Sequence, residues 1–174
     1  MNHLVFRRSV VGLAALTLVC AAYAGQGGSW RSATNAELKT LIPTRAPVEK
    51  ENIETELRTA SAVANPSGKF IAGVVLITAG YAAEGKYSNF FLTQVRMKIG
   101  AVTLPPGEYV FGWRRKDDDS LTVKFYDAPS GKFLGDVQAI RLSRVGKIES
   151  FHISPPAPKG VVQVGRFGMS YSVE

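Results

Sequence analysis

The chain has 174 residues, of which 45% are hydrophobic and 20% are charged, and its formal net charge is +7 at pH 7. A domain of this size can bury enough surface to be stable without disulfides. It contains one cysteine and two histidines, which excludes a disulfide framework and a zinc site built from several cysteines. The basic residues are scattered along the sequence, which argues against nucleic acid as a partner.

The first 24 residues have the order of a secretory signal peptide. Arg7 and Arg8 form a short cationic segment, a mostly apolar stretch follows over 10–19, and Ala22 and Ala24 are the small residues of a cleavage site. The apolar stretch is too short to span a bilayer. We therefore expect a signal peptide over 1–24, export to the periplasm or the outside, and no transmembrane segment in the mature chain.

Cleavage after Ala24 would also remove Cys20 and His3, and it would lower the net charge to +5 because two arginines and no acids are lost. The mature chain would then hold no thiol and one histidine, His152. His152 lies on a predicted strand without placed partners, and no Gly-x-Ser-x-Gly turn presents a serine, so a serine triad is not expected. Most zinc or copper sites need more than one histidine. We therefore expect no catalytic residues and no cofactor.

Residues 25–33 are rich in glycine and serine and are expected to form a flexible lead-in to a single domain over 34–174. A short N-terminal helix should begin this domain, since Thr34 and Glu37 form a capping box and Pro43 ends the helical pattern. We expect about two helical turns that pack onto a sheet.

Residues 47–63 fit two patterns. Ile53 and Leu57 have helical spacing, whereas every second residue from Ile53 to Val63 alternates against a charged face, as in a half-buried strand. The turn at 65–68 leads directly into another strand, which favours a strand and a hairpin.

From residue 70 the pattern is that of β-strands separated by Gly, Pro and Asp turns. Alternation with a period of two is clearest over 91–99, and a long loop or irregular edge is expected at 79–89. Further strands are expected at 70–78, 109–113, 121–125, 133–142, 147–154 and 161–173. These closely spaced strands predict a mainly β fold, which is either a single antiparallel β-sandwich or a partly closed barrel.

Two groups of aromatic residues are candidates for a surface that binds sugars. Tyr109, Phe111 and Trp113 share one face of a predicted strand. We expect them to be core, because the residues on the other face are too small or too polar to fill a core. The second group is spread over a loop and strand ends, where binding residues are often found. Its tyrosines and the nearby basic residues form the predicted ligand-binding set: Tyr81, Tyr87, Tyr126, Lys86, Arg114 and Arg115.

Asp117, Asp118 and Asp119 form the only local cluster of oxygen ligands, and they are a candidate calcium site. Adjacent aspartates lack the spacing of known calcium loops, so a charged, solvated hairpin turn is the favoured interpretation. No other metal site is predicted. A glycosidase would need two carboxyl groups about 5–10 Å apart, and no such pair can be identified in the sequence.

The segment 104–109, Leu-Pro-Pro-Gly-Glu-Tyr, resembles the Leu-x-Pro-Gly-x-Tyr turn of bacterial extracellular sandwich modules, including prealbumin-like and collagen-adhesin B-type repeats. The resemblance implies a β-sandwich that serves as a stalk, a spacer or a carbohydrate-associated domain, and it identifies no functional residue. As a whole the chain is similar to small exported bacterial proteins of unassigned function.

The sequence therefore leads to the hypothesis of an exported, non-enzymatic β protein with a binding or scaffolding role at the cell envelope. Its partner would be an anionic or neutral polysaccharide, or another envelope protein. The alternatives are a carboxylate-dependent enzyme that acts on glycans and a purely structural or assembly protein. The ligand, the oligomeric state and the choice between sandwich and barrel stay open at this point.

Overall fold

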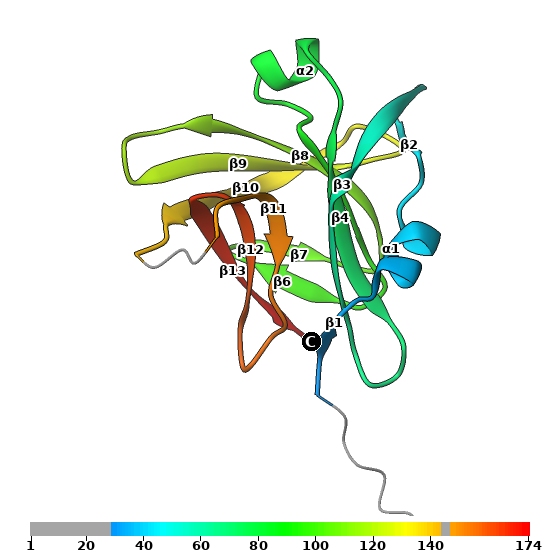
Figure 1. Ribbon diagram of the computed structural model, residues 1–174. Coiled ribbons are helices and arrows are strands. Elements are labelled where there is room, and N and C mark those ends of the chain that lie inside the picture. Colours follow the sequence, from blue (N-terminus) through cyan, green and yellow to red (C-terminus); the bar gives the residue numbers. More distant parts are fainter. Residues whose placement is uncertain (1–28, 144–146) are drawn as a thin grey trace, which may run out of the picture.

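The structure is a computed structural model that describes residues 29–143 and 147–174 (Figure 1). The expected signal peptide, residues 1–24, lies outside the described residues. Among the described residues no helix has the length and apolar character needed to cross a membrane.

Thirteen strands and two short helices are found in the part of the chain that the structure describes. The strands are β1 (Arg31–Ser32), β2 (Arg45–Val48), β3 (Glu51–Ala64), β4 (Phe70–Leu76), β5 (Asn89–Thr93), β6 (Met97–Ile99), β7 (Val102–Leu104), β8 (Gly107–Arg115), β9 (Ser120–Asp127), β10 (Phe133–Arg141), β11 (Glu149–Ile153), β12 (Gly160–Gly165) and β13 (Phe167–Val173). The helices are α1 (Asn35–Leu41) and α2 (Gly80–Ala83). Thr34 caps α1 and forms the expected capping box with Glu37.

The strands join into one antiparallel sheet that curls into a half-barrel (Figure 1). Their order is β1-β3-β4-β5-β8-β9-β10-β13-β12-β11, with β2 paired to β3 and β6 paired to both β7 and β13. The curl brings β11 back beside β3, where the backbone N–H of Ile153 donates a hydrogen bond to Ser61 Oγ at 2.9 Å. The predicted mainly β, antiparallel fold is confirmed, but two facing sheets of a sandwich are not, because strand pairing is continuous from β1 to β11.

The middle strands of the sheet are buried on both faces. On the concave face, aromatic side chains such as Phe91, Phe111 and Phe125 form the main core, with ring centroids 5.1–6.5 Å apart. On the opposite face, a second cluster that includes Val74 and Val110 lies among apolar residues of α1, β2 and the segment after α2. Burial on both faces gives these strands the near-continuous apolar sequences that a central strand requires.

The aromatic stripe on β8 is core only in part. Tyr109 and Phe111 are buried as expected, but Trp113 lies near the exposed end of β8 and is 39% exposed. Val110 and Gly112, on the other face, are buried as well. The expectation that this face is too small or too polar to fill a core is therefore wrong for Val110, which belongs to the second cluster, whereas Arg114 is exposed.

Several predicted elements differ from those observed. Most of 47–63 lies in β3, which pairs with β4 across the turn at 65–68, so the strand interpretation and its hairpin are confirmed. Residues 47 and 48 belong instead to β2, which a turn at 49–50 separates from β3. The expected strand over 91–99 is split into β5 and β6, because Thr93 Oγ1 donates to Val95 O at 2.7 Å and the chain turns there.

The expected strand over 161–173 is the hairpin of β12 and β13, which turns at Gly165 with a φ of 58°. Residues 25–33 are expected to be a flexible lead-in, but Arg31 and Ser32 of this segment form β1, which pairs with the end of β3.

Gly73 on β4 tests the packing of β11 against the sheet. A Cβ at this position would lie 2.7 Å from the ring of Phe151 and 2.9 Å from the carbonyl oxygen of Phe90. Gly73→Ala is therefore expected to lower the free energy of unfolding by about 1–3 kcal/mol, the usual cost of overpacking a core, as measured by urea unfolding. Gly80→Ala is the matched control, because a Cβ there meets nothing within 4 Å. Equal stability of the two variants would contradict this packing.

Candidate functional site

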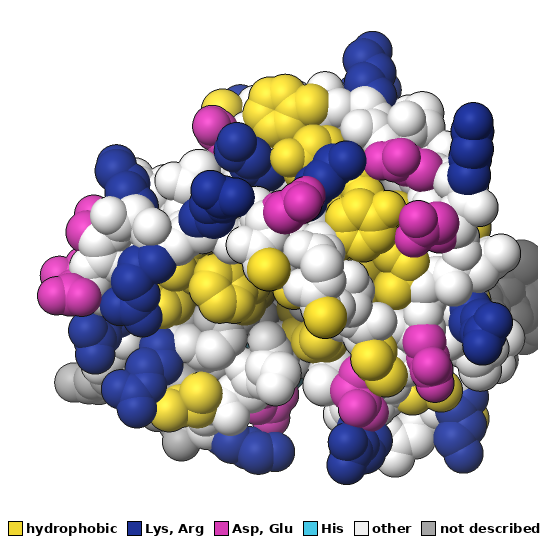
Figure 2. Space-filling model, turned by 90° about the horizontal axis from the view of Figure 1, so that it is seen from above, with side chains coloured by type: hydrophobic (Ala, Val, Ile, Leu, Met, Phe, Trp, Pro, Cys, Tyr) yellow, Lys and Arg dark blue, Asp and Glu magenta, His cyan; other side chains and the backbone are white. Residues whose placement is uncertain are grey.

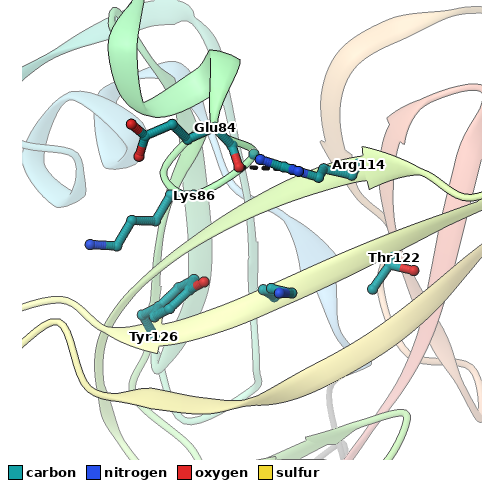
Figure 3. Close-up of a pocket in the computed structure, with 7 residues that line it drawn as sticks. Glu84, Lys86, Arg114, Thr122 and Tyr126 are labelled. Atoms are coloured by element: carbon teal, nitrogen blue, oxygen red, sulfur yellow. Dashed lines mark hydrogen bonds between the residues drawn. The ribbon is translucent and has the colours of Figure 1, made fainter.

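The segment after α2 lies directly on β8 because two glycines leave room for it. A Cβ at Gly112 would lie 2.5 Å from the carbonyl oxygens of Gly85 and Lys86. A Cβ at Gly85, whose φ is +67°, would lie 2.5 Å from Cγ of Arg114. The contact is secured by Arg114, whose Nε donates to the carbonyl oxygen of Glu84 at 2.9 Å (Figure 3). Residues 84–86 thereby form a wall above the outer face of the sheet.

Beneath this wall is a pocket of about 520 Å³. Its floor comes from β9, where Thr122, Lys124 and Tyr126 alternate and therefore share one face of the strand. Gly112 is the partner of Lys124 in the register of β8 and β9, so no side chain fills the space opposite this lysine. The complete lining is Glu84, Gly85, Lys86, Arg114, Thr122, Lys124 and Tyr126.

The pocket carries an excess of positive charge. Lys86, Arg114 and Lys124 line it together with one carboxylate, Glu84, whose side chain points away from Arg114 in Figure 3. Lys86 lies 3.4 Å from a carboxylate oxygen of Glu49. Arg114 and Lys124 make no ion pair with any residue that the structure describes. Two of the three cationic groups are therefore available to an anionic ligand.

Four aromatic rings run from α2 and the segment after it across β9 to β10, and we call them the aromatic row: Tyr81, Tyr87, Tyr126 and Phe133. Their successive ring centroids lie 5.0, 5.4 and 5.5 Å apart, which is the range of favourable aromatic contacts. The amino group of Lys86 lies 4.7 Å from the ring centroid of Tyr87, within the range of a cation–π interaction. Tyr126 belongs both to the row and to the pocket, so the two features form one surface.

Tyr87 is the buried anchor of this arrangement. Its ring is fully buried, and its hydroxyl donates a hydrogen bond to the carboxylate of Glu49 in the turn between β2 and β3. Burial and this carboxylate raise the pKa of Tyr87. The hydrogen bond from Tyr87, with a contribution from Lys86, lowers the pKa of Glu49. Tyr81 makes a similar contact nearby, with its hydroxyl 3.1 Å from the carboxylate of Glu51.

Figure 2 views the molecule from the side of α2. Lys and Arg side chains gather on the left of this face, on the side of the turn between β8 and β9, and hydrophobic side chains lie between them. The face thus combines the two kinds of side chain found in the pocket and the aromatic row.

The structure brings together most of the residues predicted from the sequence. Lys86, Arg114 and Tyr126 line the pocket, while Tyr81 and Tyr87 lie beside it and position its wall. That these residues bind a ligand stays a prediction.

Arg115 lies apart from the pocket, because adjacent residues of a strand point to opposite faces. It pairs with Asp118 at 3.4 Å and lies 5.8 Å from the ring centroid of Phe167.

Sequence reasoning missed Thr122, Lys124 and Phe133. The first two alternate with Tyr126 along β9, and this period of two was a signal that could have identified them. Phe133 is the partner of Tyr126 in the register of β9 and β10, and no local pattern indicates that pairing.

The aspartate cluster forms a turn. The carboxylate of Asp117 accepts hydrogen bonds from the backbone N–H of Asp119 at 2.9 Å and from Ser120 Oγ at 2.8 Å, and these bonds lower the pKa of Asp117. Asp119 lies 3.7 Å from Arg141. Within residues 29–143 and 147–174, no group of three or more His, Cys, Asp or Glu side chains is placed to hold a metal ion. His152 lies on β11 and is 3.4 Å from the carboxylate of Glu149.

Scans against protein-family models, curated proteins and solved structures found no significant match. The geometry of the site itself indicates what it can bind. Cationic groups neutralise and hydrogen-bond anionic groups, and aromatic rings pack against flat apolar surfaces. Both kinds of group are present on one open face of the sheet.

Tyr87→Phe tests the anchor, because it removes the hydroxyl and keeps the buried ring. We expect a loss of about 1 kcal/mol in the free energy of unfolding at pH 7, since the hydrogen bond involves a partly exposed carboxylate. The pKa of Glu49 is lower in the folded than in the unfolded protein. Its contribution is therefore present above the unfolded value of about 4.3 and is lost as the pH falls through the folded pKa. The difference between the two proteins should shrink on acidification.

Urea unfolding at a series of pH values measures this difference. Tyr81→Phe is the matched control, because it removes a hydroxyl from a less buried ring of the same row, and it should cost less stability. A loss in Tyr87→Phe that is the same from neutral to strongly acidic pH would contradict the role given to Glu49.

Proposed function

We propose that the protein is exported and acts as a non-enzymatic binding module at the cell envelope, with a polysaccharide as its ligand. The observation that carries this proposal is the cationic pocket on β8 and β9 directly beside the aromatic row. The signal-peptide pattern of residues 1–24 supports export.

A saccharide suits the mixed chemistry of this surface. Sugar rings have flat apolar faces that pack on aromatic side chains, and their hydroxyl groups accept hydrogen bonds from lysine and arginine. Tyr126 offers a ring, and Lys124 and Arg114 offer donors within the same pocket.

The site is built on a rigid frame. Thr122, Lys124 and Tyr126 project from β9, whose other face is packed into the main core through Val123 and Phe125. Groups carried by such strands are positioned more precisely than groups on loops, and less conformational entropy is lost when they bind. This favours a preformed binding site over one that must be ordered by its ligand.

Ligand-dependent thermal unfolding of the purified protein tests the proposal with a panel of neutral and acidic polysaccharides. A ligand that binds only the folded state, at 100 times its Kd, stabilises the protein by about 2.7 kcal/mol. For a domain of this size, we expect Tm to rise by several degrees. Lys124→Ala should reduce the rise, because it removes a cation from the floor of the pocket.

Lys69→Ala is the matched control, because Lys69 is an exposed lysine at the turn between β3 and β4, outside the pocket. It should leave the rise in Tm unchanged. If no polysaccharide raises Tm, the binding proposal fails and a structural role takes its place.

A further inference from the structure

The charge of the pocket selects among polysaccharides. Its lining holds three cationic side chains and one carboxylate, and a neutral ligand would leave this excess uncompensated. Asp136 is the partner of Lys124 in the register of β9 and β10, but no ion pair between them is found in the described structure. The floor of the pocket therefore presents an unpaired cation.

Arg114 is held in an orientation that leaves its donors free. Its Nε donates to the carbonyl oxygen of Glu84, and its terminal nitrogens have no hydrogen-bond acceptor among the described residues. Thr122 is the partner of Arg114 in the register of β8 and β9, so its hydroxyl lies on the same face of the sheet. A guanidinium whose Nε is held by the carbonyl oxygen of another residue is suited to bind a planar carboxylate through two parallel hydrogen bonds from its terminal nitrogens.

The aromatic rings of Tyr126 and Phe133 lie beside these cations. Phe133 is 51% exposed, and its ring centroid lies 5.5 Å from that of Tyr126. An exposed phenylalanine packed beside a pocket-lining tyrosine extends the aromatic row out of the pocket. A ligand that covers both rings and reaches the cations must therefore combine a flat apolar face with a negative charge a short distance away.

We propose that the ligand is an acidic polysaccharide of the uronic-acid class, an inference that rests on the proposed function. The carboxylate of one sugar unit binds Arg114 and Lys124 in the pocket. A neighbouring sugar ring packs on Tyr126 and Phe133. A polymer is favoured over a lipid surface because the cations lie in a pocket walled by residues 84–86, where an extended chain can enter but a flat membrane meets the wall first.

The test is titration calorimetry of the purified protein with polygalacturonate, with its methyl-esterified form and with dextran. The esterified polymer has the same backbone without the charge, so it separates the role of the carboxylate from that of the sugar ring. We expect binding to polygalacturonate, at least tenfold weaker binding to the two neutral polymers, and weaker binding at 1 M than at 0.1 M salt, since the Debye length falls from about 10 Å to about 3 Å.

Two variants separate the two parts of the site. Lys124→Ala should weaken binding of polygalacturonate about tenfold, the effect of losing one hydrogen bond to a charged group. It should also reduce the preference over the esterified polymer, with the remainder supplied by Arg114. Phe133→Ala should weaken binding of the charged and esterified polymers by the same factor, because it removes a ring and no charge. Lys69→Ala should change neither, and thermal unfolding without ligand shows that each variant is folded.

Each other result overturns a distinct part of the argument. Equal binding of polygalacturonate and the neutral polymers would overturn the acidic class and leave the proposed function intact. Binding of polygalacturonate that Lys124→Ala does not alter would overturn the placement of the carboxylate. Failure to bind any polysaccharide would overturn both the inference and the proposed function. Binding to phosphatidylglycerol vesicles in place of the polymers would assign the pocket to a lipid surface.

Discussion

Burial of the middle strands on both faces is the constraint on which the rest of the structure depends. The concave face of the sheet encloses the main core, and α1, β2 and the segment after α2 cover the other face of β4, β5 and β8. Beyond β8 this cover reaches only the end of β9, where Tyr87 packs on Tyr126. On the next strand, β9, the outward residues are therefore Thr122, Lys124 and Tyr126 rather than an apolar row. The pocket lies at the border between the covered and the uncovered part of the sheet.

The border is sharp because the covering segment approaches the backbone of β8 closely. Gly112 has no side chain, so residues 85 and 86 contact the strand itself, and Arg114 holds them there. A larger residue at position 112 would lift the wall and fill the space opposite Lys124 at the same time. The depth of the pocket and the position of its wall thus have the same cause.

Much of the fold could be predicted from the sequence because most strands have one apolar face or are apolar throughout. The hairpin of β3 and β4 around the turn at 65–68 and the β-rich region after residue 70 follow from alternation and turn residues. The turn at 49–50, which separates β2 from β3, does not. The splitting of 91–99 could not be predicted, since β6 leaves its neighbour β5 to pair with β13 and β7. A continuous curled sheet is likewise set by long-range pairing, which local patterns do not encode.

Prediction of the candidate site from the sequence has the same limit, because part of the site depends on long-range pairing. Tyr126 and Arg114 could be chosen by residue type, but the partnership of Tyr126 with Phe133 depends on the register of β9 and β10. The sequence indicates Tyr87 as a candidate for a binding surface, whereas it is fully buried and hydrogen-bonds Glu49. Residue type alone indicates that a tyrosine is available, and tertiary packing decides whether it meets solvent or holds a loop in place.

The turn between β2 and β3 joins three segments that are distant in sequence. Glu49, at a φ of 55°, donates its backbone N–H to Ala128 at 2.7 Å and accepts the hydroxyl of Tyr87. A non-glycine residue keeps such a conformation only when its surroundings hold it. The turns at the two ends of β3, at 49–50 and at 65–68, therefore differ as sites for protein engineering. A fluorescent label or an affinity tag inserted at the exposed turn 65–68 would leave these contacts untouched. The same insertion at 49–50 would loosen both the α2 loop and the turn after β9, and with them the rim of the pocket.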